Sequence, residues 1–334
     1  MNVGKLSNEE LSRVIFDEIK EIRSDILVRP GVGEDCGVVK IEDMACVLTT
    51  DPITGATEEL GKLAVHVSLN DVASSGAEPV AILLTLLCPE NTEPKEIQRI
   101  ISDANREANA LNVEIIGGHT EITSAVNRII VSVTAFGKTP VEKLIRTKGA
   151  HAEDYLYLTK HVALEGTAII AREKEEDLRE VLGRSEIQEA MEMFNKISVL
   201  KEGQIGSTVG VSAMHDVTEG GVLGAIYELC ECNELGCKVY NHQFNVKEVT
   251  QKICDYYTLN PLKLISSGSM LMSVPRDKAP EFEQQMLQAE IEYAKIGFLT
   301  EVQDKLLVYG EEADQEIADP IEPPMSDELY KVVG

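Results

Sequence analysis

The sequence predicts an α/β protein with two domains. Short apolar segments typical of buried strands alternate with amphipathic segments typical of helices along most of the chain. The 334 residues are enough for two domains and a substantial core. Residues 137–150 contain Pro140 and Gly149 and are typical of a joint between domains. We therefore expect an N-terminal domain over residues 1–148, a C-terminal domain over residues 149–310 and an acidic tail over residues 311–334.

The charge of the chain limits the kinds of partner that it can bind. Fifty-seven acidic residues against 31 basic ones give a net charge of −26, which argues against nucleic acid as a partner. A bound nucleotide would need metal ions and backbone N–H groups around its phosphates. The seven irregularly spaced cysteines indicate reduced thiols, and no segment is typical of a signal peptide or a membrane span. We expect a cytoplasmic protein with no membrane partner.

The first third of the chain contains two acidic turns around a strand. Ser7 and Glu10 form a capping-box pattern before an amphipathic helix that extends to Ile22. The glycine-rich segment 31–37 contains acids that could hold a cation, although a surface turn is the simpler interpretation. A strand is expected over residues 45–50, with Asp51 and Pro52 ending it. An acid at the end of a strand lies where α/β folds bind ligands, and a plain turn is equally compatible.

A helix over residues 60–75 is the element around which the rest is organised. Asn70 and Asp71 lie inside it, although Asp is a poor helix former. Gly76 and Pro79 then end the helix. Asp71 is either a satisfied core carboxylate or a ligand for a hard cation. Taken alone, this segment favours the structural interpretation.

The first of two glycine pairs follows a predicted strand. A strand over residues 80–88, buried on both faces, and a helix from Thr92 precede the first pair. Gly117 and Gly118 come after a short strand over residues 113–116 and allow backbone N–H groups to approach a ligand. His119 and Glu121 come next, and either could contact metal or substrate or be structural. A further strand is expected over residues 127–136.

The second half of the chain repeats this pattern. A strand over residues 154–159 leads into a helix, and another turn and strand are expected around residues 264–274. Gly220 and Gly221 follow the segment 214–219 and directly precede a helix, where exposed N–H groups favour anionic ligands. The spacing of Cys230, Cys232 and Cys237 is not that of a zinc site and indicates small buried side chains. We expect part of the tail beyond Gly310 to be extended or mobile.

Five motifs in order resemble one enzyme superfamily. It includes aminoimidazole ribonucleotide (AIR) synthetase, the hydrogenase maturation factor HypE, selenophosphate synthetase and thiamine-monophosphate kinase. The resemblance covers most of the chain. Among these enzymes, the sequence as a whole resembles HypE and its relatives most. The motifs are Gly33-Glu34-Asp35-Cys36-Gly37, Thr49-Thr50-Asp51, Asn70-Asp71 with Ser75-Gly76-Ala77, Gly117-Gly118-His119-Thr120, and Asp216-Val217-Thr218 with Gly220-Gly221.

The resemblance implies an N-terminal domain whose strands join those of a second subunit in a dimeric β-barrel, and a C-terminal α/β domain. It also implies that the protein is a homodimer binding ATP with Mg²⁺. The resemblance matches Asp35, Asp51, Asp71 and Asp216 to acids that hold Mg²⁺ and the phosphates, and it matches Asn70, Gly117 and Gly118 to residues that shape the same site. We take Asp71, His119 and Asp216 as candidate catalytic residues. The candidate cofactor-binding residues are Asn70, Gly117, Gly118, Thr218, Gly220 and Gly221. Mg²⁺ prefers such oxygen ligands and bridges carboxylates to polyphosphate. The implied activity is phosphorylation of an amide-like or other oxygen of an unidentified substrate, with release of ADP.

The sequence also departs from the members of this superfamily. HypE carries its substrate on a C-terminal cysteine, whereas the last cysteine here is Cys254. His119 stands where AIR synthetase and thiamine-monophosphate kinase have an acid. An alternative is therefore a non-catalytic nucleotide-binding partner in a complex that matures a hydrogenase or another metalloenzyme. A third possibility is a structural α/β dimer whose acids are surface charges.

Overall fold

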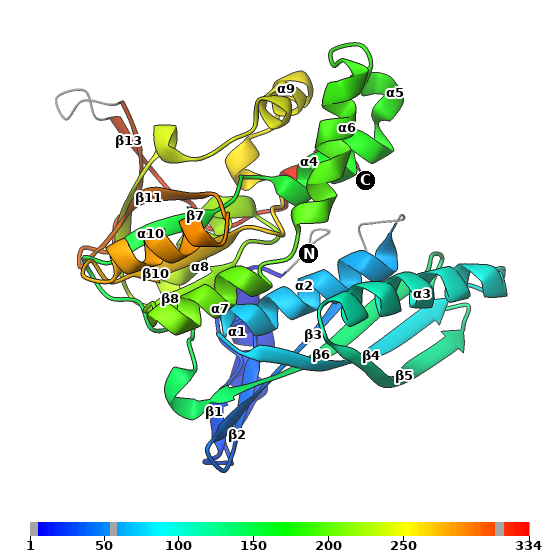
Figure 1. Ribbon diagram of the computed structural model, residues 1–334, viewed down its shortest axis with the longest axis horizontal. Helices are drawn as coiled ribbons and strands as arrows, with labels where there is room; N and C mark the ends of the chain where they lie inside the picture. Colours follow the sequence, from blue (N-terminus) through cyan, green and yellow to red (C-terminus); the bar gives the residue numbers. More distant parts are fainter. Residues whose placement is uncertain (1–5, 54–58, 311–316, 334) are drawn as a thin grey trace.

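The computed structural model describes residues 6–53, 59–310 and 317–333 and contains two sheets with their helices (Figure 1). The first sheet has six strands in the order β1-β2-β3-β6-β4-β5, and only the β4–β5 pair is parallel. The first domain contains α1 (Asn8–Val14), η1 (Phe16–Glu18), β1 (Ile26–Val28), β2 (Gly37–Ile41), β3 (Met44–Ile53), α2 (Leu60–Ser74), β4 (Glu78–Cys88), α3 (Pro94–Ala110), β5 (Glu114–Ile122), β6 (Ile130–Pro140) and η2 (Val141–Lys143).

The second sheet has seven strands in the order β13-β12-β9-β11-β7-β10-β8, and only the β12–β9 pair is parallel. Its strands are β7 (Tyr155–Thr159), β8 (Ala213–Asp216), β9 (Gly236–Tyr240), β10 (Met270–Val274), β11 (Tyr293–Thr300), β12 (Lys305–Tyr309) and β13 (Ile317–Pro320). Its helices are α4 (Leu164–Glu173), α5 (Glu175–Leu178), α6 (Arg184–Glu192), η3 (Met193–Lys196), α7 (Leu200–Val209), α8 (Gly221–Cys232), η4 (Asn241–Gln243), α9 (Glu248–Tyr257), η5 (Pro261–Lys263), α10 (Ala279–Gln288) and η7 (Glu328–Lys331). The predicted two-domain α/β organisation is confirmed, and both sheets are mixed.

Helix α2 occupies the centre of the molecule. It packs on β3, β4 and β6 of the first sheet and also contacts α7 and β8 of the second domain (Figure 1). Every residue from Leu60 to Ser74 except Val67 is buried, because neighbours surround the helix on all sides. The predicted helix and its end at Gly76, which has a φ of +67°, are confirmed. Polar residues of α2 therefore face other parts of the protein rather than bulk water.

Several predicted boundaries were wrong. The first helix ends at Val14 instead of reaching Ile22, although its capping box at Ser7 is present. Strand β3 continues through Asp51 and Pro52. Its pairing with β2 stops at Leu48, so one side of β3 is open there, and open edges tolerate proline.

The strand with the first glycine pair is also longer than predicted, because β5 includes the whole segment from Gly117 to Glu121. Strand β4 is not buried on both faces within one chain, since Leu83 is 40% exposed on the side away from α2. Strand β6 begins at Ile130 rather than at residue 127 and ends at Pro140. None of the described helices combines the length and apolarity needed to cross a bilayer.

Candidate functional site

A cavity of about 590 Å³ lies where the two domains meet. Its walls come from both domains and from segments close to both ends of the chain. The lining elements are α1 and η1, the loop 31–35, the end of β3, α2, the start of α4, the segment 215–219, the loop 265–267 and the segment 324–330. Residues far apart in sequence therefore meet in one enclosure.

All four predicted metal-binding acids line this cavity. Asp35 precedes β2, Asp51 lies on β3, Asp71 lies on α2 and Asp216 ends β8. Each comes from a different element, so their approach results from the tertiary fold. The structure thus brings the four acids together, and their role as metal ligands stays a prediction.

Hydroxyl groups hold two of these carboxylates. The Oγ1 atom of Thr49 donates to Asp71 at 2.6 Å, and the Oγ of Ser74 donates to Asp35 at 3.0 Å. Burial raises the pKa of Asp71 well above its usual range, and the nearby charges of Asp216, Asp51 and Asp35 add to the rise. A divalent cation among these carboxylates would oppose this repulsion and favour the ionised form.

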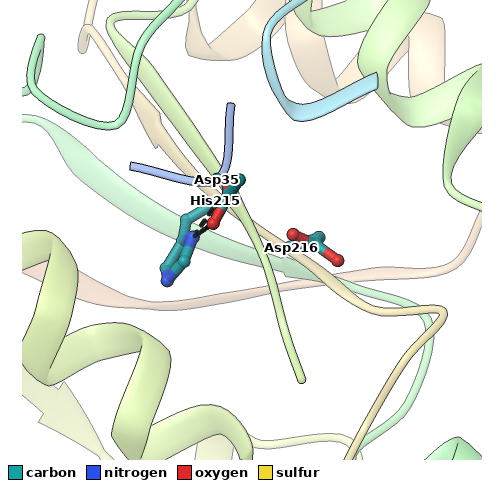
Figure 2. A group of neighbouring side chains, drawn as sticks. All are labelled: Asp35, His215 and Asp216. Atoms are coloured by element: carbon teal, nitrogen blue, oxygen red, sulfur yellow. Dashed lines mark hydrogen bonds and ion pairs between the residues drawn. The ribbon is translucent and has the colours of Figure 1, made fainter. Parts of the chain in front are cut away.

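His215 adds a titratable group to the acid cluster (Figure 2). Its Nδ1 atom lies 3.0 Å from a carboxylate oxygen of Asp35, and its Nε2 lies 3.1 Å from Glu228. Burial acts to lower the pKa of His215, but these two carboxylates outweigh it and raise the pKa well above the ordinary value. Potential ligand atoms of Asp35, His215 and Asp216 all lie within 4.8 Å of one another, so this group could hold a metal ion.

Asn70 is next to Asp71 but faces elsewhere. It does not line the cavity. Its Nδ2 donates to the carbonyl of Ile197 at 2.8 Å, and its Oδ1 accepts from the N–H of Val199 at 2.9 Å. Asn70 therefore ties α2 to the second domain beside the site.

The second glycine pair already binds an anionic group, and that group belongs to the chain itself. The N–H of Gly220 donates to Asp327 Oδ2 at 2.7 Å. A Cβ on Gly221 would lie 2.7 Å from the carbonyl of Leu262, so this helix start requires glycine. Thr218 lines the cavity nearby. The anion preference predicted for the start of α8 is thus met by a carboxylate of the C-terminal segment.

The described part of the acidic tail is packed against the second domain. Asp327 also accepts from the N–H groups of Ile265 at 3.2 Å and Leu329 at 2.8 Å, and Tyr330 donates to Glu219 at 2.7 Å. Ile321 and Leu329 are buried. Residues 317–320 are extended in strand β13, as predicted for part of the tail, whereas residues 321–333 pack against the second domain and help to line the cavity. Residues 311–316 lie outside the described part.

The first glycine pair lies away from the acids within one chain. Gly118 pairs with Leu84, Leu84 with Val133, and Val133 with Asp51, so Gly118 and Asp51 are three strands apart. At a strand spacing of about 4.8 Å this separation is roughly 14 Å. The His119 side chain is 66% exposed, and its Nε2 lies 3.5 Å from Glu121. The cofactor and catalytic roles of Gly117, Gly118 and His119 stay predictions.

Glu165 and Ser267 are two of the cavity residues that were not singled out from the sequence. Glu165 in the first turn of α4 and Ser267 in the loop before β10 are both buried, and both line the cavity. The one sequence signal for Glu165 is an acid within the apolar run from Val162 to Ile170. A pattern of this kind does not reveal that the side chain faces a cavity.

Family models match both domains of the chain. The model described as AIR synthase related protein, N-terminal domain, matches residues 33–139, and the corresponding C-terminal domain model matches residues 151–309. A protein of Methanocaldococcus jannaschii named putative hydrogenase expression/formation protein is 29% identical over 287 residues, which cover 83% of this chain and 82% of that protein. Selenide, water dikinase of Carboxydothermus hydrogenoformans is 25% identical, with 91% and 95% covered. Carbamoyl dehydratase HypE of Rhodobacter capsulatus is 23% identical, with 80% and 79% covered.

Solved structures share the fold of the chain. HypE in a HypE–HypF complex aligns with a TM-score of 0.73 at 20% identity, covering 86% of this chain and 93% of that one. The hydrogenase maturation protein HypE in complex with ATP aligns with a TM-score of 0.68 at 16% identity, covering 99% and 98%. At these identities the likeness concerns the fold, while the two family models together span most of the sequence. The chain therefore belongs to the AIR synthase related protein family.

Proposed function

We propose that the protein binds ATP with Mg²⁺ in the cavity between its domains and phosphorylates an amide-like oxygen of a substrate, releasing ADP. The observation that carries this proposal is the meeting of Asp35, Asp51, Asp71 and Asp216 in one cavity. Oxygen-rich carboxylate clusters are typical Mg²⁺ sites, and Mg²⁺ commonly bridges carboxylates to phosphate oxygens.

The residues present fit a divalent cation. Burial raises the pKa of Asp71, and the charges of Asp216, Asp51 and Asp35 raise it further, so a cation among them would favour the ionised form. Asp35, Asp51, Asp71 and Asp216 would hold the ion, which would neutralise charge on the phosphates during transfer. Thr49 and Ser74 orient two of these carboxylates through their hydroxyl groups.

The names of related proteins support nucleotide chemistry. A solved HypE structure contains ATP, and a solved ThiL structure contains AMPPCP and TMP. Two relatives are named carbamoyl dehydratase and selenide, water dikinase. Nucleotide binding is common to the two solved complexes, and the acid cluster is compatible with it through a divalent cation.

We also propose a homodimer formed through the first sheet. Leu48 and Leu83 are exposed on its face away from α2, and Ile116 and Ile122 are exposed on β5. Because Gly118 lies roughly 14 Å from the acids of its own chain by strand spacing, its segment would serve the site of a second copy. Analytical ultracentrifugation should find a dimer, and Leu83→Lys should dissociate it.

Calorimetry with Mg²⁺ and ATP tests the nucleotide site. The parent should bind ATP only with Mg²⁺, and Asp71→Asn should weaken that binding at least tenfold. Asp43→Asn, at an exposed turn between β2 and β3, is the matched control and should bind as the parent does. An Asp71→Asn variant that binds Mg–ATP like the parent would remove the basis of the proposal.

The second candidate is a nucleotide-binding partner without turnover in a maturation complex. One relative is named for hydrogenase expression and formation, and a related structure is a HypE–HypF complex. Measuring ADP release with carbamoyl, amide and phosphate-monoester compounds separates the two candidates. Tight Mg–ATP binding with no turnover of any of them would favour the second.

A further inference from the structure

The imidazole of His215 is held between two elements of the fold. His215 lies on β8, and its Nε2 atom lies 3.1 Å from Oε2 of Glu228 on α8. The loop with Asp35 packs closely on α8, since a Cβ on Gly33 would lie 3.3 Å from the carbonyl oxygen of Glu228. The side chain of His215 is 6% exposed. The ring is therefore enclosed, with a carboxylate on each side.

The other ring nitrogen faces both oxygens of Asp35. Nδ1 lies 3.0 Å from Oδ1 and 3.0 Å from Oδ2, and Figure 2 shows the two side chains directed at each other. A cation bound by both oxygens of one carboxylate must also lie at similar distances from the two, so Nδ1 occupies that position. Ser74 Oγ donates to Oδ2 as well, at 3.0 Å. Asp35 is thus left to bind an ion through a single oxygen, and Oδ1 is the less occupied one.

The number of oxygens that a carboxylate offers affects which cation it binds. Ca²⁺ takes roughly six to eight oxygen ligands, and these commonly include carboxylates that bind through both oxygens. Mg²⁺ needs near-octahedral geometry at about 2.1 Å and keeps several water ligands. A carboxylate restricted to one oxygen therefore suits Mg²⁺ better than Ca²⁺.

We infer that His215, held by Glu228, restricts Asp35 to one metal–oxygen bond and so makes the site select Mg²⁺ over Ca²⁺. This inference rests on the function proposed above, in which Asp35 is one of the metal ligands. His215 and Glu228 are positioning residues here, since each acts through its neighbour and neither contacts the ion. Partners of this kind orient metal ligands in many proteins, and their loss costs about 10–100-fold in metal affinity.

A competing arrangement would make His215 itself a ligand. Potential ligand atoms of Asp35, His215 and Asp216 lie within 4.8 Å of one another. Imidazole suits transition metals, whereas Mg²⁺ prefers oxygen. Both ring nitrogens already lie at hydrogen-bond distance from a carboxylate, and a nitrogen that donates a hydrogen bond has no lone pair for a metal ion. His215 is therefore placed outside the coordination sphere of the proposed Mg²⁺.

Two substitutions at His215 separate its two contacts. The amide nitrogen of Asn is as many bonds from the backbone as Nδ1, and that of Gln is as many as Nε2. His215→Asn therefore keeps a donor towards Asp35, whereas His215→Gln keeps one towards Glu228 and leaves both oxygens of Asp35 open to an ion. His242→Gln, at an exposed position on η4, is the matched control. Thermal unfolding establishes that each variant folds.

The measurement is calorimetry of AMPPCP binding at increasing Mg²⁺ or Ca²⁺, which gives the half-saturating concentration of each ion. The parent should need less Mg²⁺ than Ca²⁺. His215→Gln should need about tenfold more Mg²⁺ while its Ca²⁺ requirement stays within about threefold of the parent, because Ca²⁺ gains a second oxygen. His215→Asn and His242→Gln should keep the preference of the parent. Equal half-saturation by both ions in the parent, or an equal loss for both ions in His215→Gln, would overturn the inference.

Glu228 and a spectroscopic probe provide independent checks. Glu228→Ala should shift the ion preference in the same direction as His215→Gln, and Glu228→Gln, which keeps an acceptor for Nε2, should restore it. Mn²⁺ bound with AMPPCP should show no coupling to an imidazole nitrogen in electron spin-echo spectra. Coupling that is present in the parent and absent from His215→Gln would make His215 a ligand and overturn the inference. If His215→Gln does not fold, the two Glu228 variants and the Mn²⁺ spectrum of the parent still decide the question.

Failure of the proposed function is distinguishable from failure of this inference. If AMPPCP binds the parent with neither ion, the proposed nucleotide site is wrong and the inference falls with it. If AMPPCP binds with both ions and their ratio is unchanged in His215→Gln and Glu228→Ala, the nucleotide site stands and the role given to His215 and Glu228 is wrong.

Discussion

Replacing Glu165 by Gln should make the protein more stable at pH 8 than at pH 5, relative to the parent. Burial raises the pKa of Glu165 from 4.5 to about 7. At about 1.4 kcal/mol for each pKa unit, this rise corresponds to about 3 kcal/mol. Below pH 4.5 the carboxyl is protonated in both folded and unfolded chains, so it contributes no difference. As the pH rises to 7, the unfolded chain ionises first and the folded chain loses stability.

The assay is urea unfolding of both proteins at several pH values between 5 and 8, with coincident fluorescence and circular dichroism as the check on two-state behaviour. The difference in free energy of unfolding should shift in favour of Glu165→Gln by about 3 kcal/mol at most across this range. Any packing cost of the amide is common to all pH values and cancels in the comparison. The exposed Glu175→Gln variant controls for the loss of one negative charge. A difference that stays constant with pH would refute the reasoning.

Three other substitutions test single contacts. Gly118→Ala should destabilise the protein by about 3 kcal/mol or more in urea unfolding, because its Cβ would lie 1.9 Å from a carbonyl oxygen of β4. The Cβ of Gly117→Ala would meet a movable side chain at 3.2 Å, so this variant should lose less stability. Thr49→Val removes the 2.6 Å hydrogen bond to the buried carboxylate on α2 and should weaken Mg–ATP binding about tenfold in calorimetry; unchanged affinity would speak against that carboxylate as a ligand. Asp327→Ala should speed proteolysis of the C-terminal segment and amide exchange at Gly220, while Asp327→Asn keeps an acceptor and should change both less.

The sequence was informative where local chemistry decides the structure. The helix around Asp71 and the capping box at Ser7 follow from residue spacing and side-chain hydrogen bonding. The true end of β3 could not be predicted from residue spacing. Pro52 fits inside this strand because β2 pairs with β3 only as far as Leu48 and leaves an open edge beyond it. The packed tail did not follow either, since Leu329 is buried by elements distant in sequence.

The candidate site was predicted in a similar, partial way. The ordered motifs indicated that Asp35 and Asp216 would meet, and the structure places both in one cavity. The motifs could not show that the N–H of Gly220 donates a hydrogen bond to Asp327, because the sequence of the tail carries no local signal for that contact. Glu165 was not predicted, because only its burial in the folded chain distinguishes it from an ordinary acid at a helix start.

The position of Asn70 restricts how the cavity can open. Its amide bonds to Ile197 and Val199 clamp the two domains together one residue before Asp71. Swinging the domains apart would break both bonds and displace the helix that carries the carboxylate. Nucleotide entry is therefore expected past residues 6–16 and 324–330, which line the cavity without taking part in this clamp.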